Sequence, residues 1–392
     1  MESDNKLFLL DAYALIYRAY YAFIKNPRIN SKGFNTSAIL GFVNTLEEVL
    51  KKENPTHIGV AFDPAGPTFR HEAFEQYKAQ REETPEAIRL SVPIIKEIIR
   101  AYRIPILEVA GYDADDVIGT LATEAGRQGI ITYMMTPDKD YGQLVSDKVF
   151  MYRPKHTGGF EVMGVDEVKA KFDIQSPAQV IDMLGLMGDS SDNIPGCPGV
   201  GEKTAQKLIA EFGSIENLLE HTDQLKGALK TKVETNREMI TFSKFLATIK
   251  IDVPIQLDMD SLVREQADED SLRQIFEELE FRTLIDRVLK KENAGNGITT
   301  PTGNKTAAEK SNLAPLPLFP EEGGAVQGDL FANFTGNEPG EAKNSNLATL
   351  ETLNCDYQLI DTEEKREKII QKLLTSKILS LDTETTGTEP MD

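Results

Sequence analysis

The sequence of 392 residues contains no tryptophan, two cysteines and four histidines. Cys197 and Cys355 lie far apart, so they predict no disulfide framework and are typical of a cytoplasmic protein with reduced thiols. Cysteine and histidine show no zinc-binding spacing. No run of 18 apolar residues occurs and the N-terminus lacks the basic segment of a secretory signal. We therefore expect neither a transmembrane helix nor a membrane partner.

Basic residues are also scarce, because 43 lysines and arginines stand against 63 aspartates and glutamates, for a net charge of −20. This charge argues against a simple polyanion binder, since affinity for a phosphate backbone comes mostly from lysine and arginine. Two interpretations of the acidity stay open at this point. The carboxylates either provide solubility or gather locally to hold divalent metal ions.

The organisation of the chain follows from its composition, with 40% hydrophobic and 27% charged residues and a length that allows two or three domains. Short apolar segments such as LFLLD, GVAFD, IPILEV and ITYMMTPD alternate with helical patterns over residues 1–174. This alternation predicts an α/β fold with a mostly parallel central sheet flanked by helices. Residues 175–290 show only helical patterns, so we expect an all-helical subdomain there.

The last hundred residues differ in character from the first 290. Residues 291–347 are rich in Gly, Pro, Asn, Ser and Thr without sustained periodicity, which predicts a flexible linker. Within 348–392, TEEKREKIIQKLLTSK predicts a helix and KILSLDTETTG a strand that ends in carboxylates. Only eight residues follow Glu384, so we expect 348–392 to be the truncated start of another domain.

Nine aspartates follow predicted strands or open predicted helices. They are Asp11, Asp63, Asp113, Asp115, Asp116, Asp138, Asp140, Asp189 and Asp192. A single aspartate in such a place is commonly a helix cap or a turn residue. The carboxyl ends of parallel strands meet at one edge of a sheet, however, and nine carboxylates there would repel one another without a cation. Oxygen-only ligation favours Mg²⁺ or Mn²⁺.

A glycine-rich segment, NIPGCPGVGEKTAQKLIAEF, precedes a predicted helix. Glu202 separates Gly201 from Lys203, so the P-loop spacing fails and an ATP site is disfavoured. A helix–hairpin–helix fits better, because its glycines bring backbone N–H groups close to a nucleic-acid phosphate. The alternative is a glycine turn between core helices.

The connection after Asp63, DPAGPTFRHEAFEQYKAQREETPEAIRLS, is too long for an ordinary loop. Its basic and aromatic residues alternate, and they include Arg70, Tyr77, Lys78 and Arg81. Charge and stacking of this kind suit the grip on a single nucleic-acid strand. An amphipathic surface helix is the alternative, because several glutamates dilute the positive charge.

These motifs together resemble the 5′-nuclease (flap endonuclease) domain at the N-terminus of the bacterial DNA polymerase I family, over residues 7–288. The motifs that carry the resemblance are LFLLDAYALIYRAYYAF, GVAFDPAGPTFRHEAFEQYKAQR, GYDADDVIGTLA, TPDKDYGQLV and LMGDSSDNIPGCPGVGEKTA. The resemblance implies a two-metal site formed by the aspartates above. Asp113 departs from the family, which usually has Glu there, so a water-bridged contact is expected of it.

The resemblance also implies roles for basic residues. Arg70, Lys78 and Arg81 would act on the scissile phosphate or the threaded strand. DNA contacts are expected of Arg18, Tyr77, Gly196, Gly199, Gly201, Lys203, Thr204 and Lys207. A monovalent cation at the hairpin is a further expectation. Asp382 and Glu384 resemble the first metal-binding motif of 3′→5′ exonucleases.

The expected activity is that of a monomeric, structure-specific 5′–3′ exonuclease and 5′-flap endonuclease. Its substrates would be DNA with a 5′ flap, a nick or a 5′ end, RNA primers included, in replication and repair. One alternative is a complete DNA polymerase, which the chain length disfavours. The other is a non-catalytic DNA-binding scaffold that uses only the hairpin and needs no cluster of carboxylates.

Overall fold

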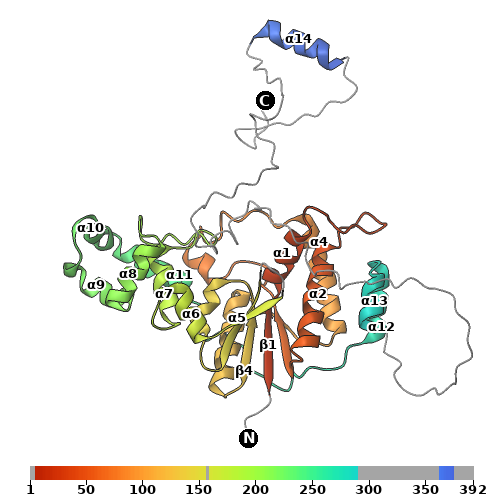
Figure 1. Cartoon of the computed structure of the whole chain (residues 1–392), viewed down its shortest axis with the longest axis horizontal. Helices are drawn as coiled ribbons and strands as arrows, with labels where there is room; N and C mark the ends of the chain where they lie inside the picture. The colour runs from red at the N-terminus through yellow and green to blue at the C-terminus, as the bar shows by residue number, and fades with distance from the viewer. Residues whose placement is uncertain (1–4, 156–158, 290–361, 375–392) are drawn as a thin grey trace, which may run out of the picture. The chain divides into compact units, whose positions relative to one another are not determined.

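The computed structural model describes residues 5–155, 159–289 and 362–374. A six-stranded sheet in the order β3-β2-β1-β4-β5-β6 lies at its centre (Figure 1). The strands are β1 (Lys6–Asp11), β2 (His57–Ala61), β3 (Ile106–Leu107), β4 (Ile131–Met135), β5 (Val149–Pro154) and β6 (Phe160–Met163). Neighbouring strands are parallel except β5 and β6. The predicted α/β fold with a mostly parallel sheet is therefore confirmed.

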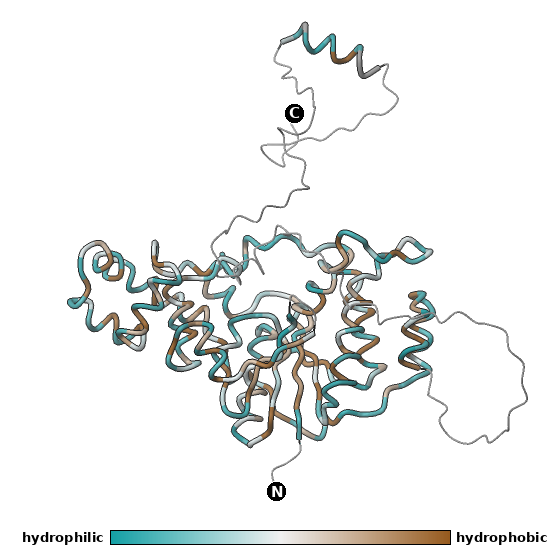
Figure 2. The backbone as a smooth tube through the Cα atoms, viewed as in Figure 1, coloured by the Kyte–Doolittle hydropathy of each residue, from teal (hydrophilic) through white to brown (hydrophobic). Residues whose placement is uncertain are grey.

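Strand β1 shows why the sheet is buried on both faces. Leu7 and Leu9 pack into one hydrophobic core, whereas Phe8 and Leu10 pack into a second core on the opposite face. This alternation is the period of two that a strand imposes on its side chains. The continuous apolar run LFLL is typical of a parallel strand covered by helices on both sides. Figure 2 shows hydrophobic residues concentrated along the strands.

Helices of the first half of the chain cover the two faces of the sheet. The core that contains Phe8 includes residues of α1 (Ala12–Ala22), α2 (Ser37–Lys52) and α4 (Glu86–Ala101). The core that contains Leu7 includes residues of α5 (Ala114–Arg127) and α6 (Val165–Phe172). The short α3 (Phe69–Ala73) and the 3₁₀ helix η1 (Lys139–Leu144) follow β2 and β4.

The second half of the chain is helical as predicted. It comprises α7 (Gln179–Met187), α8 (Glu202–Phe212), α9 (Ile215–Glu220), η2 (Thr222–Gln224), α10 (Gly227–Thr235), α11 (Arg237–Ala247), α12 (Glu269–Glu278) and α13 (Arg282–Leu289). Helices α7 and α8 continue the core of α5, so no separate core forms there. Leu272 and Phe276 of α12 instead bury themselves in the core of α2 and α4.

The C-terminal region forms a second unit, residues 333–392. Its described part is α14 (Glu363–Leu374), which confirms the helix predicted there. The predicted linker over 291–347, the strand KILSLDTETTG and its Asp382 and Glu384 lie outside the described residues. The bounds of the four predicted regions stay predictions.

The segment IPILEV forms only the two-residue β3, because it pairs with β2 through two residues at the edge of the sheet. Strands β5 and β6 were not predicted. Among the described helices, none is both long and apolar enough to span a bilayer.

Candidate metal centre

The strand order places the predicted carboxylates at one edge of the sheet. The order reverses between β1 and β4, and in open α/β sheets ligands bind at the carboxyl ends of the strands where the order reverses. Asp11 ends β1, Asp63 follows β2 by two residues, and Asp138 follows β4 by three. The negative charges of Asp63 and Asp138 both act on Asp11, so the three carboxylates share one site.

Asp11 is held by three donors. Its Oδ1 accepts a hydrogen bond from the Ala14 amide (3.2 Å), which caps α1, and its Oδ2 accepts from Thr136 Oγ1 (3.1 Å) and Tyr141 Oη (3.4 Å). The pKa of Asp11 is raised to about 7, mainly by burial and secondly by the charge of Asp63. A bound cation would stabilise the charged form of such a buried carboxylate.

The N-terminus of α5 carries three aspartates with different surroundings. One oxygen of each of Asp113, Asp115 and Asp116 lies within 4.8 Å of the others, the arrangement of a potential cation site. Asp116 is fully buried and accepts two hydrogen bonds from Arg70, at 2.7 and 2.8 Å. Asp115 is only half-buried, and burial together with Asp116 raises its pKa well above the ordinary value. Asp63 joins them through the Ala114 amide (2.7 Å).

Asp113 caps α5, and each of its carboxylate oxygens accepts a hydrogen bond from a basic side chain. It accepts from Arg70 Nη1 at 3.0 Å and from Lys78 Nζ at 3.1 Å. Its side chain is 6% exposed, so little of the carboxylate is open to a metal ion. This placement is compatible with the expectation that Asp113 does not bind a metal ion directly.

The other four aspartates come from the segment after β4 and from the loop before the hairpin. The Asp140 amide donates to Asp138 Oδ1 (3.0 Å), and the Asp189 carboxylate accepts from Lys139 Nζ (2.7 Å). The buried Oδ1 of Asp140 receives no hydrogen bond from the described residues. Burial, and next Asp138, raises the pKa of Asp140 well above the ordinary value.

Two glycines shape the loop that carries Asp189 and Asp192. Gly188 and Gly196 have φ angles of +74° and +63°, which side-chain-bearing residues rarely adopt. A Cβ atom on Gly196 would collide with the backbone of Gly188. The loop closes because the Asp189 amide donates to the Ile194 carbonyl (2.9 Å) and the Ile194 amide donates back (2.8 Å). A larger residue at either glycine would open this loop and displace both aspartates.

This set of donors fits a divalent cation. It consists of carboxylate oxygens, which hard cations prefer. Several of these carboxylates have raised pKa values, first because they are buried and second because like charges lie close together. The unpartnered Oδ1 of Asp140 is a buried acceptor that a cation would satisfy.

The predicted basic residues divide into two groups. Arg70 is 1% exposed, and besides Asp113 and Asp116 it donates to the carbonyls of Leu246 (2.9 Å) and Thr248 (2.8 Å). All the N–H groups of its guanidinium thus donate to protein acceptors. This does not suit the direct contact with a phosphate that was expected of Arg70.

Lys78 and Arg81 lie closer to solvent than Arg70, with side chains 16% and 41% exposed. Arg81 Nη2 lies 2.5 Å from Asp192 Oδ1, and the Lys78 amide donates to the Asp192 carbonyl (3.0 Å). Although burial favours the neutral acid, Lys78 and Arg81 lower the pKa of Asp192. Tyr77 is 2% exposed and donates to Asp192 Oδ2 (3.1 Å), so its ring is no open stacking surface.

The hairpin residues lie in the loop between α7 and α8 and in the first turns of α8. Gly199, Gly201, Lys203 and Lys207 are exposed, Thr204 is half-buried and Gly196 is buried, with its amide bonded to Ser243 Oγ (3.0 Å). Arg18 lies half-buried on α1 and donates to the Lys155 carbonyl (3.4 Å). The structure therefore brings the aspartates together with Arg70, Lys78 and Arg81, whereas the lysines of the hairpin project from α8.

Sequence reasoning missed three residues that position the carboxylates, namely Thr136, Lys139 and Tyr141. Thr136 Oγ1 donates to Asp11 and accepts from the Asp138 amide (3.2 Å), and so connects two strands of the site. All three stand in TPDKDY, directly beside Asp138 and Asp140. That proximity was the signal that could have identified them.

The raised carboxyl pKa values have a measurable consequence for stability. The folded protein holds a proton on Asp11 up to about pH 7, whereas the unfolded chain releases it near 3.8. Without divalent ions, we therefore expect the free energy of unfolding contributed by this group to be greatest near pH 4 and to fall as the pH rises through 7. The melting temperature in EDTA, recorded at a series of pH values, measures this dependence.

The control for this expectation is added Mg²⁺ or Ca²⁺. Either ion should raise the melting temperature more at pH 8 than at pH 5.5, because protons and cations compete for the same carboxylates. Asp11→Asn should flatten the dependence in EDTA. A metal-free protein that becomes more stable between pH 6 and pH 8 would contradict the placement of these groups.

Comparisons with known proteins agree with this geometry. Residues 6–173 match the family described as "5′-3′ exonuclease, N-terminal resolvase-like domain", and residues 175–270 match "5′-3′ exonuclease, C-terminal SAM fold". DNA polymerase I of Bacillus subtilis (strain 168) is 43% identical over 291 residues, 74% of this chain and 33% of the relative. DNA polymerase I of Bacillus caldotenax is 41% identical over 287 residues, 72% of this chain and 32% of the relative. The chain thus spans about a third of the length of these curated relatives.

Solved structures share the fold. A T5 5′-exonuclease with bound divalent metal ions (zinc) superposes with a TM-score of 0.54 at 20% identity, covering 71% of this chain and 99% of its own. The bacteriophage T5 D15 flap endonuclease, in a pseudo-enzyme-product complex with DNA and metal ions, gives 0.52 at 21% identity, covering 70% and 100%.

Proposed function

The chain belongs to the 5′-3′ exonuclease family, whose N-terminal and C-terminal domains it carries in order, and we propose that it hydrolyses DNA phosphodiesters at 5′ ends, nicks and 5′ flaps. The observation that carries the proposal is the convergence of Asp11, Asp63, Asp115 and Asp138 at one edge of the sheet. We further propose a role in replication and repair, primer removal included, which the likeness to bacterial DNA polymerase I supports. We also propose that the protein is a monomer and acts in the bacterial cytoplasm.

The proposed resident cofactors are two Mg²⁺ or Mn²⁺ ions. The carboxylates proposed to hold them are Asp11, Asp63, Asp115, Asp138, Asp140, Asp189 and Asp192. When bound, such ions polarise the phosphate and favour ionisation of water at neutral pH. In the reaction a water oxygen bonds to phosphorus, the bond from phosphorus to the 3′ oxygen breaks, and a 5′ phosphate and a 3′ hydroxyl remain.

Lys78 and Arg81 are the residues proposed to bind the reacting phosphate. Both lie at the acidic cluster, through ion pairs with Asp113 and Asp192, and both keep exposed surface. Their positive charges would compensate negative charge that develops on the phosphate oxygens. Arg70 is proposed as a positioning residue instead, because it holds the carboxylate of Asp116 and thereby the N-terminus of α5.

The helical subdomain at 175–290 is proposed to bind the duplex, and the domain at 1–174 to carry the chemistry. Backbone amides at Gly199 and Gly201, with the exposed Lys203 and Lys207 of α8, would contact backbone phosphates. A monovalent cation at the hairpin belongs to the same proposal.

The experiment that tests the function is a titration of Mg²⁺ and Mn²⁺ against cleavage of a 5′-labelled flap duplex. Matched substrates are the same duplex with a nick alone and a single strand without a duplex. Metal-dependent release of the flap supports the proposal. Duplex binding without cleavage in either metal would favour the non-catalytic scaffold, and extension of a primer would favour a polymerase.

One prediction concerns the division between binding and chemistry. Lys203→Ala should weaken duplex binding and reduce the slope of log affinity against log salt by about one unit, because one phosphate contact is lost. The single-turnover rate at saturating enzyme should stay near the wild-type rate. Fluorescence anisotropy in Ca²⁺ measures the affinity at several salt concentrations.

The matched variant for this prediction is Arg81→Ala, which should mainly lower the single-turnover rate. Lys169→Ala, a lysine on α6 outside the hairpin, should leave the salt slope unchanged. The reverse pattern, with Lys203 governing the rate and Arg81 the affinity, would mean that the two basic surfaces are exchanged.

A further inference from the structure

A strip of five aromatic rings connects the segment after β2 with helix α11. We name it the aromatic strip and define it by its ring contacts, Tyr112–Phe69 (5.8 Å), Phe69–Phe245 (6.1 Å), Phe245–Phe242 (6.1 Å) and Phe242–Phe74 (5.7 Å). Phe69 and Phe74 come from the domain at 1–174, whereas Phe242 and Phe245 come from the helical subdomain. The proposed function assigns no role to this strip.

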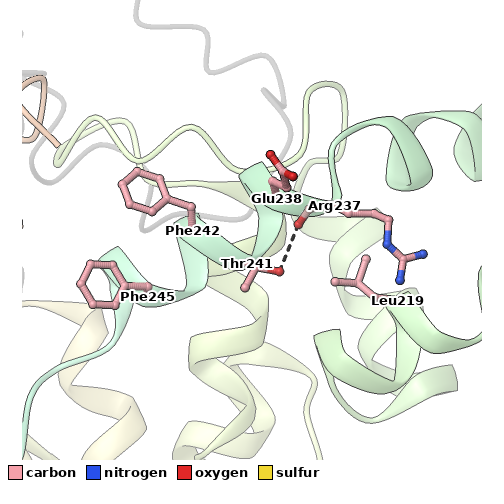
Figure 3. A pocket seen from close by; sticks show the side chains of 6 residues that line it. All are labelled: Leu219, Arg237, Glu238, Thr241, Phe242 and Phe245. Atoms are coloured by element: carbon pink, nitrogen blue, oxygen red, sulfur yellow. Dashed lines mark hydrogen bonds between the residues drawn. The ribbon is translucent and has the colours of Figure 1, made fainter. Parts of the chain in front are cut away.

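Helix α11 presents two of the rings on one side. Phe242 and Phe245 are three residues apart, project in the same direction and are nearly parallel, with 19° between the ring planes (Figure 3). They line a pocket of about 500 Å³ with Leu219, Arg237, Glu238 and Thr241. Phe245 is 46% exposed, which is unusual for a large aromatic residue that could pack inward.

The aromatic strip is continuous with the carboxylate cluster. The Arg70 guanidinium carbon lies 4.6 Å from the Phe69 ring centroid, and the same guanidinium holds Asp113 and Asp116. Tyr112 directly precedes Asp113 in the sequence. The strip therefore begins beside the proposed reaction site and extends from there to the pocket on α11.

Charge around the pocket is nearly balanced. Arg237 and Glu238 carry opposite charges on the same turn of α11. Lys250 lies 6.0 Å from the Phe69 ring centroid, and its amine is paired with Asp252 at 2.7 Å. A phosphate backbone would gain little here, whereas the face of a base would gain a stacking surface.

We infer that the aromatic strip binds unpaired bases of a single-stranded nucleic acid, and that a 5′ flap beside the carboxylate cluster is the strand it takes. This deepens the proposed function and rests on it for the identity of the strand. Continuity with the acidic cluster, together with two phenylalanine rings and only one aliphatic side chain in the pocket lining, favours a nucleic acid over a peptide. Stacking of this kind tolerates any base sequence.

The absence of tryptophan from the sequence provides a direct probe. Phe245→Trp places the single tryptophan of the protein at the exposed ring of the strip. We expect its emission to be quenched when single-stranded oligothymidylate is added to the full chain in EDTA, where no cleavage can occur. Unchanged emission at saturating oligonucleotide, with saturation measured by anisotropy, would overturn the inference. An emission shift that follows protein concentration without DNA would identify a contact between two copies and would also overturn it.

A second variant separates stacking from simple packing. Phe245→Leu keeps an apolar side chain but removes the ring face, and we expect it to weaken oligothymidylate binding about five- to tenfold. The ratio of wild-type to variant affinity should be equal at low and high salt, because no phosphate contact is lost. Val162→Ala is the control, an apolar residue on β6 that is 47% exposed.

The outcomes distinguish this inference from the proposed function. If Phe245→Leu binds oligothymidylate as tightly as the wild type does, the aromatic strip is only a packing contact between α11 and the segment after β2. If the introduced tryptophan is quenched while the wild-type chain cleaves no flap in any metal, the strip binds single strands and the proposed nuclease activity fails. If cleavage succeeds and quenching fails, the flap takes another path.

Discussion

Asp115→Asn should lower the single-turnover rate of flap cleavage at about 1 mM Mg²⁺ by at least about a hundredfold. Asp115 is half-buried, and burial together with the charge of Asp116 raises its pKa well above the ordinary value. A bound cation would strongly stabilise the charged form of this carboxylate. Replacement by asparagine keeps the shape and removes the charge that would hold the ion.

The measurement uses a 5′-labelled flap duplex with enzyme in excess. Binding of the same duplex in Ca²⁺ should survive, because the proposed duplex contacts lie on the hairpin and not on α5. Asp138→Asn should act as Asp115→Asn does. Asp166→Asn is the control, since its side chain on α6 is 94% exposed. Wild-type cleavage by either cluster variant would show that the metal assignment is wrong.

Arg70→Met should destabilise the fold by about 3–5 kcal/mol. The side chain of Arg70 is 1% exposed and forms ion pairs with Asp113 at 3.0 Å and Asp116 at 2.7 Å. Removing the guanidinium leaves two buried carboxylates without their main positive partner, and an uncompensated buried charge is costly. The free energy of unfolding in urea, measured in EDTA, reports the change.

The control variants decide what Arg70 does. Arg81→Met should cost less than about 1 kcal/mol, because its ion pair with Asp192 is partly exposed to solvent. Arg70→Met combined with Asp116→Asn should be less destabilised than the sum of the single changes, since the buried charge that remains is smaller. If Arg70→Met keeps the wild-type stability and loses only the cleavage rate, Arg70 contacts the substrate, as the family resemblance implied.

The fold class was accessible from the sequence because local patterns report local geometry. The run LFLL in β1 is apolar at every position, which indicates a strand buried on both faces and hence a parallel sheet. Strand β5 was missed since its segment VFMYRP ends in Arg153 and Pro154 and lacks the acidic end that identified the other strands. Strand β6, at the edge, is only four residues long.

The candidate site was accessible in part. Asp11, Asp63 and Asp138 could be assigned to one edge, because parallel strands bring their carboxyl ends together wherever they lie in the sequence. The hydrogen-bond partner of Asp113 and Asp116 could not be assigned, because it is Arg70, which lies 43 and 46 positions away in the sequence. Tyr77 was read as a stacking residue from its neighbours, and only the structure showed that it is buried against Asp192.

The sequence by itself determined the order of the first four strands and the helices between them, the acidic ends of β1 and β2 and the glycine-rich segment before α8, because each depends on neighbours within a few residues. Only the tertiary structure decided which charges face one another and which remain accessible. Arg70 is buried and holds the N-terminus of α5 because the carbonyls of Leu246, in α11, and of Thr248, directly after α11, accept from its remaining donors. The same packing set Phe245 beside Phe69, at a separation in sequence that no local periodicity can report.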